Sequence, residues 1–368
     1  MTLLWFLRPF CQGLGALLQS DPDTTSSTNN QARPRDLACD PVAGYGPREV
    51  GRNMNEAERI ARLAGILGSG GAGVELGIGD DGAVVAASMT PLVWSIDAAV
   101  EHVHFERAWL DAECLGYRAT MAALSDLAAM GATPLGVLAA LVLPPTLDEA
   151  WLDGIARGQR RACDEVETAV IGGNLSRGAE LSITTSVLGT AARAMRRDRV
   201  RPGDALWLAG PVGLARAGFH ALLKGELPGE SELHAWRYPR ARIGEGLAAC
   251  AVAEAAIDVS DGLAVDAARL AEASSVALEL DAAALLDDTL RAAAARVGMA
   301  PLELALYGGE DYALLVAAPE GAAFGPEFRR IGSARPVTEA ERVARSWVWL
   351  NEGTLRRPVL ARGFDHFE

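Results

Sequence analysis

From Val74 onward the chain alternates short apolar runs with amphipathic segments, and this alternation limits the fold more than any other feature of the sequence. Runs that are apolar or alternating over five to ten residues predict strands, and longer runs with helical spacing predict helices. The predicted strands are 91–100, 135–143, 168–172 and 181–189, and the predicted helices are 108–130 and 146–165. Pro144-Pro145 end a strand, and Thr146 with Glu149 predicts a capped helix start. The order indicates an α/β (α+β) fold.

The second half of the chain repeats this alternation after a new start near residue 200. The segment 200–210 reads as a turn leading into a strand. The further predicted elements are helices at 213–223, 240–252, 263–273 and 288–297 and a strand at 276–280. A chain of 368 residues, half of them hydrophobic, can bury two cores. We therefore expect two domains, 54–200 and 201–368.

Residues 1–53 differ in composition from the rest of the chain. An apolar stretch of 20 residues precedes a polar, proline-containing stretch that is typical of disorder. We expect a disordered extension or a mis-assigned start with Met54 as the first residue, and a secretory signal is the alternative. Asn55 and Glu58 then predict a capping box for a helix through Leu67.

Charge and cysteine usage exclude several classes of function. The net charge of −14 and the isoelectric point of about 4.9 disfavour nucleic acid and anionic membrane surfaces as partners. No apolar run is long enough to span a bilayer. The five cysteines are scattered and form no CxxC pair, so neither a disulfide framework nor a zinc site is indicated. We expect a cytoplasmic protein.

Lysine is nearly absent, which restricts how the protein can handle a nucleotide. Lys224 is the only lysine, and Gly225 follows it, so the chain has no GxxxxGK[ST] loop. P-loop enzymes and protein kinases both place a lysine on the nucleotide phosphates. If this chain binds ATP, it must do so through arginine, backbone amides and a metal ion.

The stretch "GIGDDGAVV", residues 77–85, places two carboxylates where glycine spacing imitates a phosphate-binding loop. The strand-like residues Val84 and Val85 follow it instead of a helix, so a dinucleotide fingerprint is not indicated. Two like charges about 4 Å apart repel by about 4 kcal/mol near a protein surface. The pair Asp80-Asp81 therefore forms either a turn before a strand or a metal-binding turn.

Carboxylates recur within apolar or glycine-rich stretches in the rest of the chain. They are Asp97, Asp126, Asp258, Asp261, Glu310 and Asp311. Each alone could be a capping or turn residue, and Asp258 and Asp261 could cap the helix that begins near Gly262. Buried carboxylates are rare unless they are paired or bind a cation, and oxygen ligands without His or Cys favour Mg²⁺. Several such carboxylates in one chain therefore predict a site that binds Mg²⁺ together with a polyphosphate.

These motifs resemble the thiamine-monophosphate kinase family, whose superfamily includes aminoimidazole ribonucleotide synthetase and selenophosphate synthetase. The matching segments occur in family order over roughly 54–368: "ELGIGDDGAVV", "SIDAAVEHVHF", "LSDLAAMGATPLGVLAAL", "VIGGNLSRG", "RPGDALWLAGPVG", "AAIDVSDGLAVD", "YGGEDYALL" and "GFDHF". The resemblance implies an N-terminal ATP- and Mg²⁺-binding α/β domain that forms a homodimer through its sheet, and a C-terminal α/β domain. It implies direct phosphorylation of thiamine monophosphate by ATP.

The resemblance also implies roles for individual residues. The metal set is Asp81, Ser95, Ile96 through its backbone, Asp97, Asp126, Asn174, Asp258 and Asp261, of which Asp126 and Asp261 are catalytic. The ATP contacts are Gly173, Asn174, Arg197 and Ser260, and the substrate contacts are His104, Glu310 and Phe364. Alternatives are a solvated basic loop at Arg197, a core or surface histidine at His104 and a strand-entry acid at Glu310.

Two residues depart from the family pattern. Asn174 stands where the family usually has an aspartate, in "GGDT", and Ile96 replaces a common threonine. Asn174 keeps an oxygen ligand and loses a negative charge, or merely shapes a turn after Gly172-Gly173. The alternative functions are therefore another ATP-using enzyme of this superfamily and a nucleotide-binding homologue that has lost catalysis.

Overall fold

The computed structural model describes residues 54, 56–68, 70–78 and 82–363. Predictions for residues 1–53, Asn55, the Asp80-Asp81 turn and Phe364 lie outside these residues. The part from Ile60 onward forms one compact unit. Within the described part, no helix combines the length and the apolar character needed to cross a bilayer.

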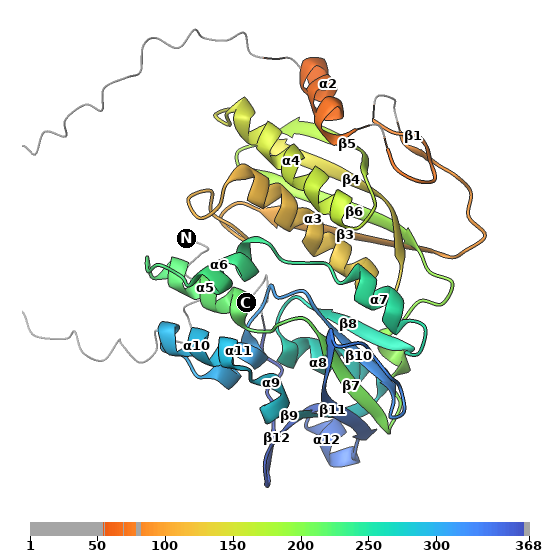
Figure 1. Ribbon diagram of the computed structural model, residues 1–368, viewed down its shortest axis with the longest axis vertical. Coiled ribbons are helices and arrows are strands. Elements are labelled where there is room, and N and C mark those ends of the chain that lie inside the picture. The colour runs from red at the N-terminus through yellow and green to blue at the C-terminus, as the bar shows by residue number, and fades with distance from the viewer. Residues whose placement is uncertain (1–53, 55, 69, 79–81, 364–368) are drawn as a thin grey trace, which may run out of the picture. The chain divides into compact units, whose positions relative to one another are not determined.

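A four-stranded sheet occupies the first half of this unit. Its strands are β3 (Leu92–Val100), β4 (Thr133–Leu143), β5 (Val170–Arg177) and β6 (Ser182–Thr190), in the order β3-β6-β4-β5. β4 and β5 are parallel and are joined by helix α4 (Glu149–Glu165), whereas β6 is antiparallel to both of its neighbours. Helix α3 (Ala112–Ala129) packs beside α4 and against β3, β4 and β6 (Figure 1).

Helices α3 and α4 approach each other closely because glycines line their contact. A Cβ at Gly116 would stand 2.0 Å from the Ile155 carbonyl oxygen, and one at Gly158 would stand 1.9 Å from the Glu113 carbonyl oxygen. The N-cap of α4 is Asp148, whose side chain accepts a hydrogen bond from the Ala150 amide at 3.1 Å. The predicted capped helix reaching Glu165 is confirmed, whereas Thr146 as its capping residue was wrong, because Asp148 lies directly before the first turn and caps it.

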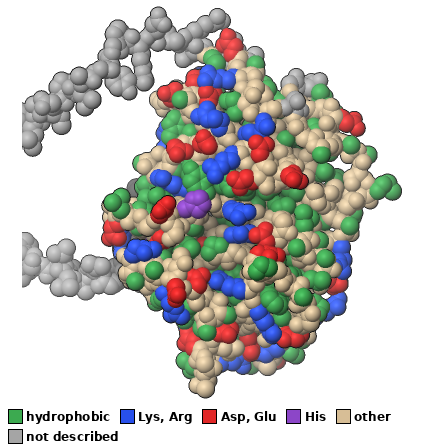
Figure 2. Space-filling view, viewed as in Figure 1, with side chains coloured by type: hydrophobic (Ala, Val, Ile, Leu, Met, Phe, Trp, Pro, Cys, Tyr) green, Lys and Arg blue, Asp and Glu red, His purple; other side chains and the backbone are tan. Residues whose placement is uncertain are grey.

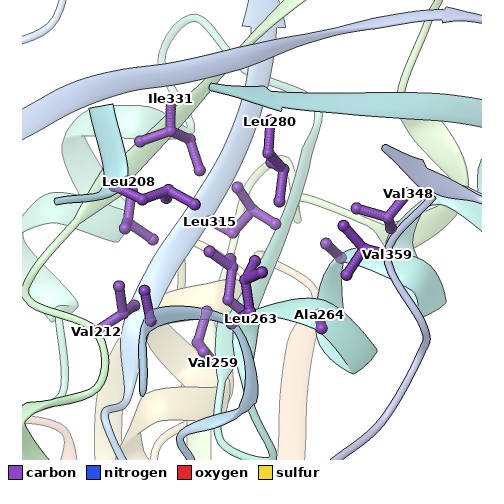
Figure 3. Packing of buried hydrophobic residues seen from close by; sticks show 14 of the residues in the cluster. Leu208, Val212, Val259, Leu263, Ala264, Leu280, Leu315, Ile331, Val348 and Val359 are labelled. Atoms are coloured by element: carbon purple, nitrogen blue, oxygen red, sulfur yellow. The ribbon is translucent and has the colours of Figure 1, made fainter. Parts of the chain in front are cut away.

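A seven-stranded sheet forms the second half, in the order β13-β12-β9-β11-β7-β10-β8. Its strands are β7 (Asp204–Ala209), β8 (Ala255–Val259), β9 (Val276–Asp281), β10 (Ala313–Pro319), β11 (Phe328–Pro336), β12 (Val348–Glu352) and β13 (Leu355–Pro358). Only the β9–β12 pair is parallel among these strands. Aliphatic side chains of the sheet, such as Leu208, Leu280 and Leu315, meet Leu263 of α8 (Leu263–Ser274) in one core (Figure 3).

The remaining described elements are short or peripheral. They are α2 (Glu56–Leu67), β1 (Val74–Leu76), β2 (Val84–Val85), η2 (Arg197–Arg199), α5 (Leu214–Leu223), α6 (Glu230–Arg237), α7 (Ile243–Ala249), α9 (Ala282–Leu285), α10 (Asp288–Val297), α11 (Pro301–Tyr307) and α12 (Glu339–Val343). On the face drawn in Figure 2, basic and acidic side chains are interspersed, in keeping with arginine ion pairs such as Arg160–Asp164 and Arg330–Glu320. The predicted mixed α/β fold is confirmed.

The contact between α3 and α4 generates a stability prediction. Gly158→Ala should lower the free energy of unfolding by about 1–3 kcal/mol or more, because the new methyl group collides with a backbone carbonyl that cannot move freely. The matched control is Gly65→Ala in α2, where nothing lies within 4 Å of the added Cβ. That change should be neutral or stabilise the protein by up to about 1 kcal/mol, because alanine favours a helix.

Urea unfolding of the two variants and the wild type measures both effects. Equal stability of Gly158→Ala and Gly65→Ala would show that the two helices can separate without cost, in conflict with the packing described above.

Candidate active site

Helix α3 carries two adjacent polar residues that join the two sheets. The Ser125 hydroxyl donates a hydrogen bond to Asp258 Oδ2 at 2.6 Å, and Asp258 lies on β8 of the seven-stranded sheet. The next residue, Asp126, accepts a hydrogen bond from the Ser95 hydroxyl at 2.5 Å, and Ser95 lies on β3 of the four-stranded sheet. The structure thus brings together Ser95, Asp126 and Asp258, which the sequence predicted to act together.

Burial sets the electrostatics of this acidic pair. Burial, followed by the negative charge of Asp126, raises the pKa of Asp258 to about 7, although the hydrogen bond from Ser125 acts in the opposite direction. Burial likewise raises the pKa of Asp126, against the hydrogen bond from Ser95. The positive charge of Arg197 lowers both pKa values. Two neighbouring carboxyl groups with raised pKa values form a site that a cation stabilises.

Asp261 follows β8 on a loop that other side chains hold in place. The Arg269 guanidinium donates a hydrogen bond to Asp261 Oδ2 at 2.5 Å and another to Asp266 Oδ1 at 2.7 Å. Asp266 is buried and accepts the backbone N–H groups of Asp261 and Gly262 at 3.0 and 3.2 Å. Burial, followed by the charge of Asp261, raises the pKa of Asp266 to about 6.

The capping alternative for Asp258 and Asp261 is therefore wrong. The N-cap of α8 is Gly262, which has no capping side chain, and Asp266 from the first helical turn binds the preceding amides instead. Neither Asp258 nor Asp261 caps the helix with its side chain. Asp258 accepts a hydrogen bond from Ser125, and Asp261 accepts one from Arg269. Ser260 lies between these two aspartates, and its carbonyl oxygen accepts a hydrogen bond from the Glu310 amide at 2.7 Å.

Strand β3 presents the predicted residues on its two faces. Ser95 and Asp97 are two residues apart and lie on one face, where Ser95 reaches Asp126 on α3. Asp97 is exposed and accepts the Ala98 amide at 2.7 Å. Ile96 lies on the opposite face and is 66% exposed. Its aliphatic side chain has no ligand atom, so the predicted metal contact is through its backbone carbonyl and stays a prediction.

Gly173 and Asn174 lie on β5, where they pair with Ala139 and Ala140 of β4. A Cβ at position 173 would stand 2.0 Å from the Ala139 carbonyl oxygen, which explains the glycine. Asn174 is exposed and lies within a strand. The alternative that Asn174 shapes a turn after Gly172-Gly173 is therefore wrong, while its role toward a metal ion stays a prediction.

Arg197 is an exposed residue of η2. Its carbonyl oxygen accepts a hydrogen bond from the Ser274 hydroxyl at 2.6 Å.

The residues predicted for substrate occupy two places. His104 follows β3, and its Nδ1 accepts the Val100 amide at 3.0 Å. Glu310 precedes β10 with a positive φ of 64°, pairs with Arg118 and accepts a hydrogen bond from Trp236 Nε1 at 2.9 Å. Sequence reasoning missed Arg118 and Trp236. The one available sign was an arginine within the apolar stretch "CLGYRATMAAL" of α3.

Another carboxylate group lies beside His104 and was not among the predicted ligands. Within the described residues, Glu101, His102 and Glu106 are the one set of three His, Cys, Asp or Glu ligand atoms lying within 4.8 Å of one another. Glu101 pairs with Arg107 and accepts the Leu181 amide, and His102 Nδ1 lies 2.9 Å from Glu106. The carboxylates of this group are held by Arg107, His102 and the Leu181 amide. Among the described carboxylates of the predicted magnesium set, no three ligand atoms lie as close together.

Comparison with known proteins gives the family. The family models of "AIR synthase related protein, N-terminal domain" and "AIR synthase related protein, C-terminal domain" match residues 79–191 and 201–345. The thiamine-monophosphate kinase of Aquifex aeolicus is 34% identical over 248 residues, 66% of this chain and 81% of that protein. The Salmonella typhimurium enzyme of that name is 36% identical over 274 residues, 72% of this chain and 83% of that protein.

A solved structure agrees in fold and sequence. AaThiL complexed with AMPPCP and TMP has a TM-score of 0.70 and 31% identity, and the match covers 79% of this chain and 92% of that chain. The resemblance predicted from the motifs is confirmed by these findings. The chain belongs to the thiamine-monophosphate kinase family, within the AIR synthase related proteins.

Proposed function

We propose that this chain transfers the terminal phosphoryl group of ATP directly to thiamine monophosphate and forms thiamine diphosphate with the help of Mg²⁺. The family supports the reaction, and the observation that carries the assignment of the site is the pair of carboxyl groups of half-buried Asp126 and buried Asp258, at the place where α3 contacts strands of both sheets. Phosphoryl transfer needs in-line positioning and charge neutralisation more than covalent help, so a site of this kind suffices.

The donor set fits magnesium. Mg²⁺ prefers oxygen ligands and keeps waters or phosphate oxygens in its shell. The predicted set matches that preference. It has the carboxyl groups of half-buried Asp126 and buried Asp258, both with raised pKa values, and the Ser95 hydroxyl, and it contains no sulfur or imidazole. We assign Mg²⁺ binding to Ser95, Asp97, Asp126, Asp258 and Asp261, together with Asp81, the Ile96 carbonyl and Asn174. The bound ions would neutralise phosphate charge.

The chain's own residues orient the phosphates. Arg197 lies close enough to the acidic pair to lower both pKa values, and its planar guanidinium suits a phosphate group. Lys224, the only lysine, ends helix α5 at an exposed position, which supports a role for arginine instead. Gly173, Asn174 and Ser260 are the proposed further nucleotide contacts. We assign His104, Glu310 and Phe364 to thiamine monophosphate.

An open apolar face supports a homodimer. Leu92, Trp94 and Ile96 alternate along β3 and are 60%, 72% and 66% exposed. Ile96 lies in register with Ser186 of β6, which also pairs with Leu138 of β4, so the exposed side chains continue across the sheet. Exposed patches of this kind mark protein interfaces. We propose that two copies pair through this face.

We also propose that the protein is cytoplasmic. Cys114, Cys163 and Cys250 form no disulfide bonds, which is typical of a reducing compartment.

The first test is the reaction and its metal requirement. Purified protein should release ADP only when thiamine monophosphate, ATP and Mg²⁺ are all present, and a chelator should abolish turnover until Mg²⁺ is restored. Asp126→Asn should lower kcat by ~100-fold or more, the scale of removing one electrostatic stabiliser. The control Asp164→Asn changes an exposed aspartate of α4 and should leave kcat unchanged.

Chelator-resistant turnover would contradict the metal assignment. Equal activity of the two aspartate variants would contradict the role given to Asp126.

Asn174 supplies a second test, because one negative charge is missing from the proposed metal set. A unit charge about 4 Å away is worth between about 1 and 4 kcal/mol, and repulsion from neighbouring carboxylates offsets part of it. The wild type should therefore turn over with a raised Mg²⁺ requirement, and Asn174→Asp should lower the half-saturating Mg²⁺ concentration. Asn351→Asp, on strand β12, is the matched control.

Initial rates titrated with Mg²⁺ separate the outcomes. Superimposable curves for wild type and Asn174→Asp would remove Asn174 from the metal shell. A wild type without turnover that Asn174→Asp restores would favour the homologue that has lost catalysis.

Sedimentation velocity tests the homodimer. The wild type, with a chain mass of 38.6 kDa, should sediment as a dimer, and Trp94→Glu should sediment as a monomer because it places a charge in the apolar face. Val343→Glu changes a side chain of α12 that is 77% exposed and should leave the dimer intact. A dimeric Trp94→Glu variant, or a monomeric wild type, would contradict this proposal.

A further inference from the structure

Arg118 is a buried charge in the middle of an apolar helix. Its side chain is 7% exposed, and Leu115, Ala119 and Met121 around it on α3 are buried. A buried guanidinium is costly unless ion pairs and hydrogen bonds compensate it. The reaction as described above gives this arginine no role, so its partners indicate what it does.

Those partners converge on Glu310. The Arg118 guanidinium pairs with Glu310 Oε1 and donates a hydrogen bond to the Trp236 carbonyl oxygen. Its central carbon lies 4.8 Å from the centre of the Trp236 ring, over which it stacks. Trp236, fully buried on α6, donates from Nε1 to Glu310 Oε2 at 2.9 Å. Each carboxylate oxygen of Glu310 is thereby held from a different helix.

The backbone of Glu310 is held as well. A φ of 64° is unfavourable for a residue with a Cβ and persists only where surrounding contacts enforce it. The Glu310 amide donates to the Ser260 carbonyl oxygen at 2.7 Å, which joins it to the loop of Asp261. The Glu310 side chain is nevertheless 28% exposed, so part of this fixed side chain is accessible to a ligand.

We propose that Arg118 is a positioning residue: with Trp236 it fixes the Glu310 carboxylate to accept a hydrogen bond from an amino-substituted heteroaromatic ring, which is the aminopyrimidine of the thiamine part of the substrate. This inference rests on the proposed function. A carboxylate held in place before binding loses little conformational freedom when the ligand arrives, so its fixation strengthens substrate binding. The nucleotide phosphates meet other residues and should not depend on Arg118.

The test separates substrate binding from general stability. Arg118→Met should raise the KM for thiamine monophosphate by ~10-fold or more, the equivalent of one strong contact, and leave the KM for ATP within about 2-fold. Arg118→Lys keeps the charge without the planar fork and should give a smaller rise. Calorimetric titration with thiamine monophosphate should show the same order of weakened binding without relying on turnover.

A double-mutant cycle with Glu310→Gln identifies the route of the effect. In the Glu310→Gln background, Arg118→Met should change the KM for thiamine monophosphate by less than about 2-fold, because the group that Arg118 positions has already been altered. The matched control is Arg296→Met, which removes a different arginine that pairs with a buried glutamate of α6, Glu232. It should leave both KM values unchanged.

Three results would overturn the inference. The first is an equal rise in the KM for thiamine monophosphate from Arg118→Met with and without Glu310→Gln. The second is an equal rise from Arg118→Met and Arg296→Met. The third is unchanged substrate binding in Arg118→Lys, and this variant decides the matter if Arg118→Met does not fold. Wild-type turnover is measured in the same series. A wild type that does not phosphorylate thiamine monophosphate refutes the proposed function, whereas an active wild type with these results refutes only the role of Arg118.

Discussion

The hydrogen bonds of Ser125 and Asp126 hold the candidate site together. Adjacent residues on α3 reach in two directions, to Asp258 on the seven-stranded sheet and to Ser95 on the four-stranded sheet. Helix α3 is buried over nearly its whole length and contacts strands of both sheets, so its position fixes the relative placement of carboxylates that are far apart in sequence. The site therefore depends on the packing of one helix, including its close approach to α4 at Gly116 and Gly158.

The sequence predicted elements best where apolar periodicity was long. The helix expected at 288–297 has those bounds as α10, and the strand expected at 91–100 is β3 at Leu92–Val100. Short elements with weak periodicity escaped, such as α6 and α11. The predicted helix at 240–252 is shorter in the structure, at Ile243–Ala249, and a turn follows it at 250–252.

Side-chain partners were the less predictable part of the site. The motifs indicated that Asp126 and Asp258 act together, and the structure places them close enough to repel. They did not indicate that Asp266 binds the amides before α8, or that Arg118 pairs with Glu310 across nearly two hundred residues. Sequence spacing shows which residues share a helix face or a strand face, whereas pairs between distant segments are set by the tertiary fold. An isolated charge in an apolar helix is the one local sign of such a pair.

The use of arginine in place of lysine follows from these surroundings. Arg118 and Arg269 each contact two groups at once, Glu310 with the Trp236 carbonyl in one case and Asp261 with Asp266 in the other. A guanidinium has five N–H donors in a fixed plane and stays charged when buried, whereas a buried ammonium readily loses its proton. Carboxylates that must keep one orientation are therefore better held by arginine. The same property makes Arg197 suited to phosphate, and it explains how a chain with one lysine can assemble a site for phosphoryl transfer.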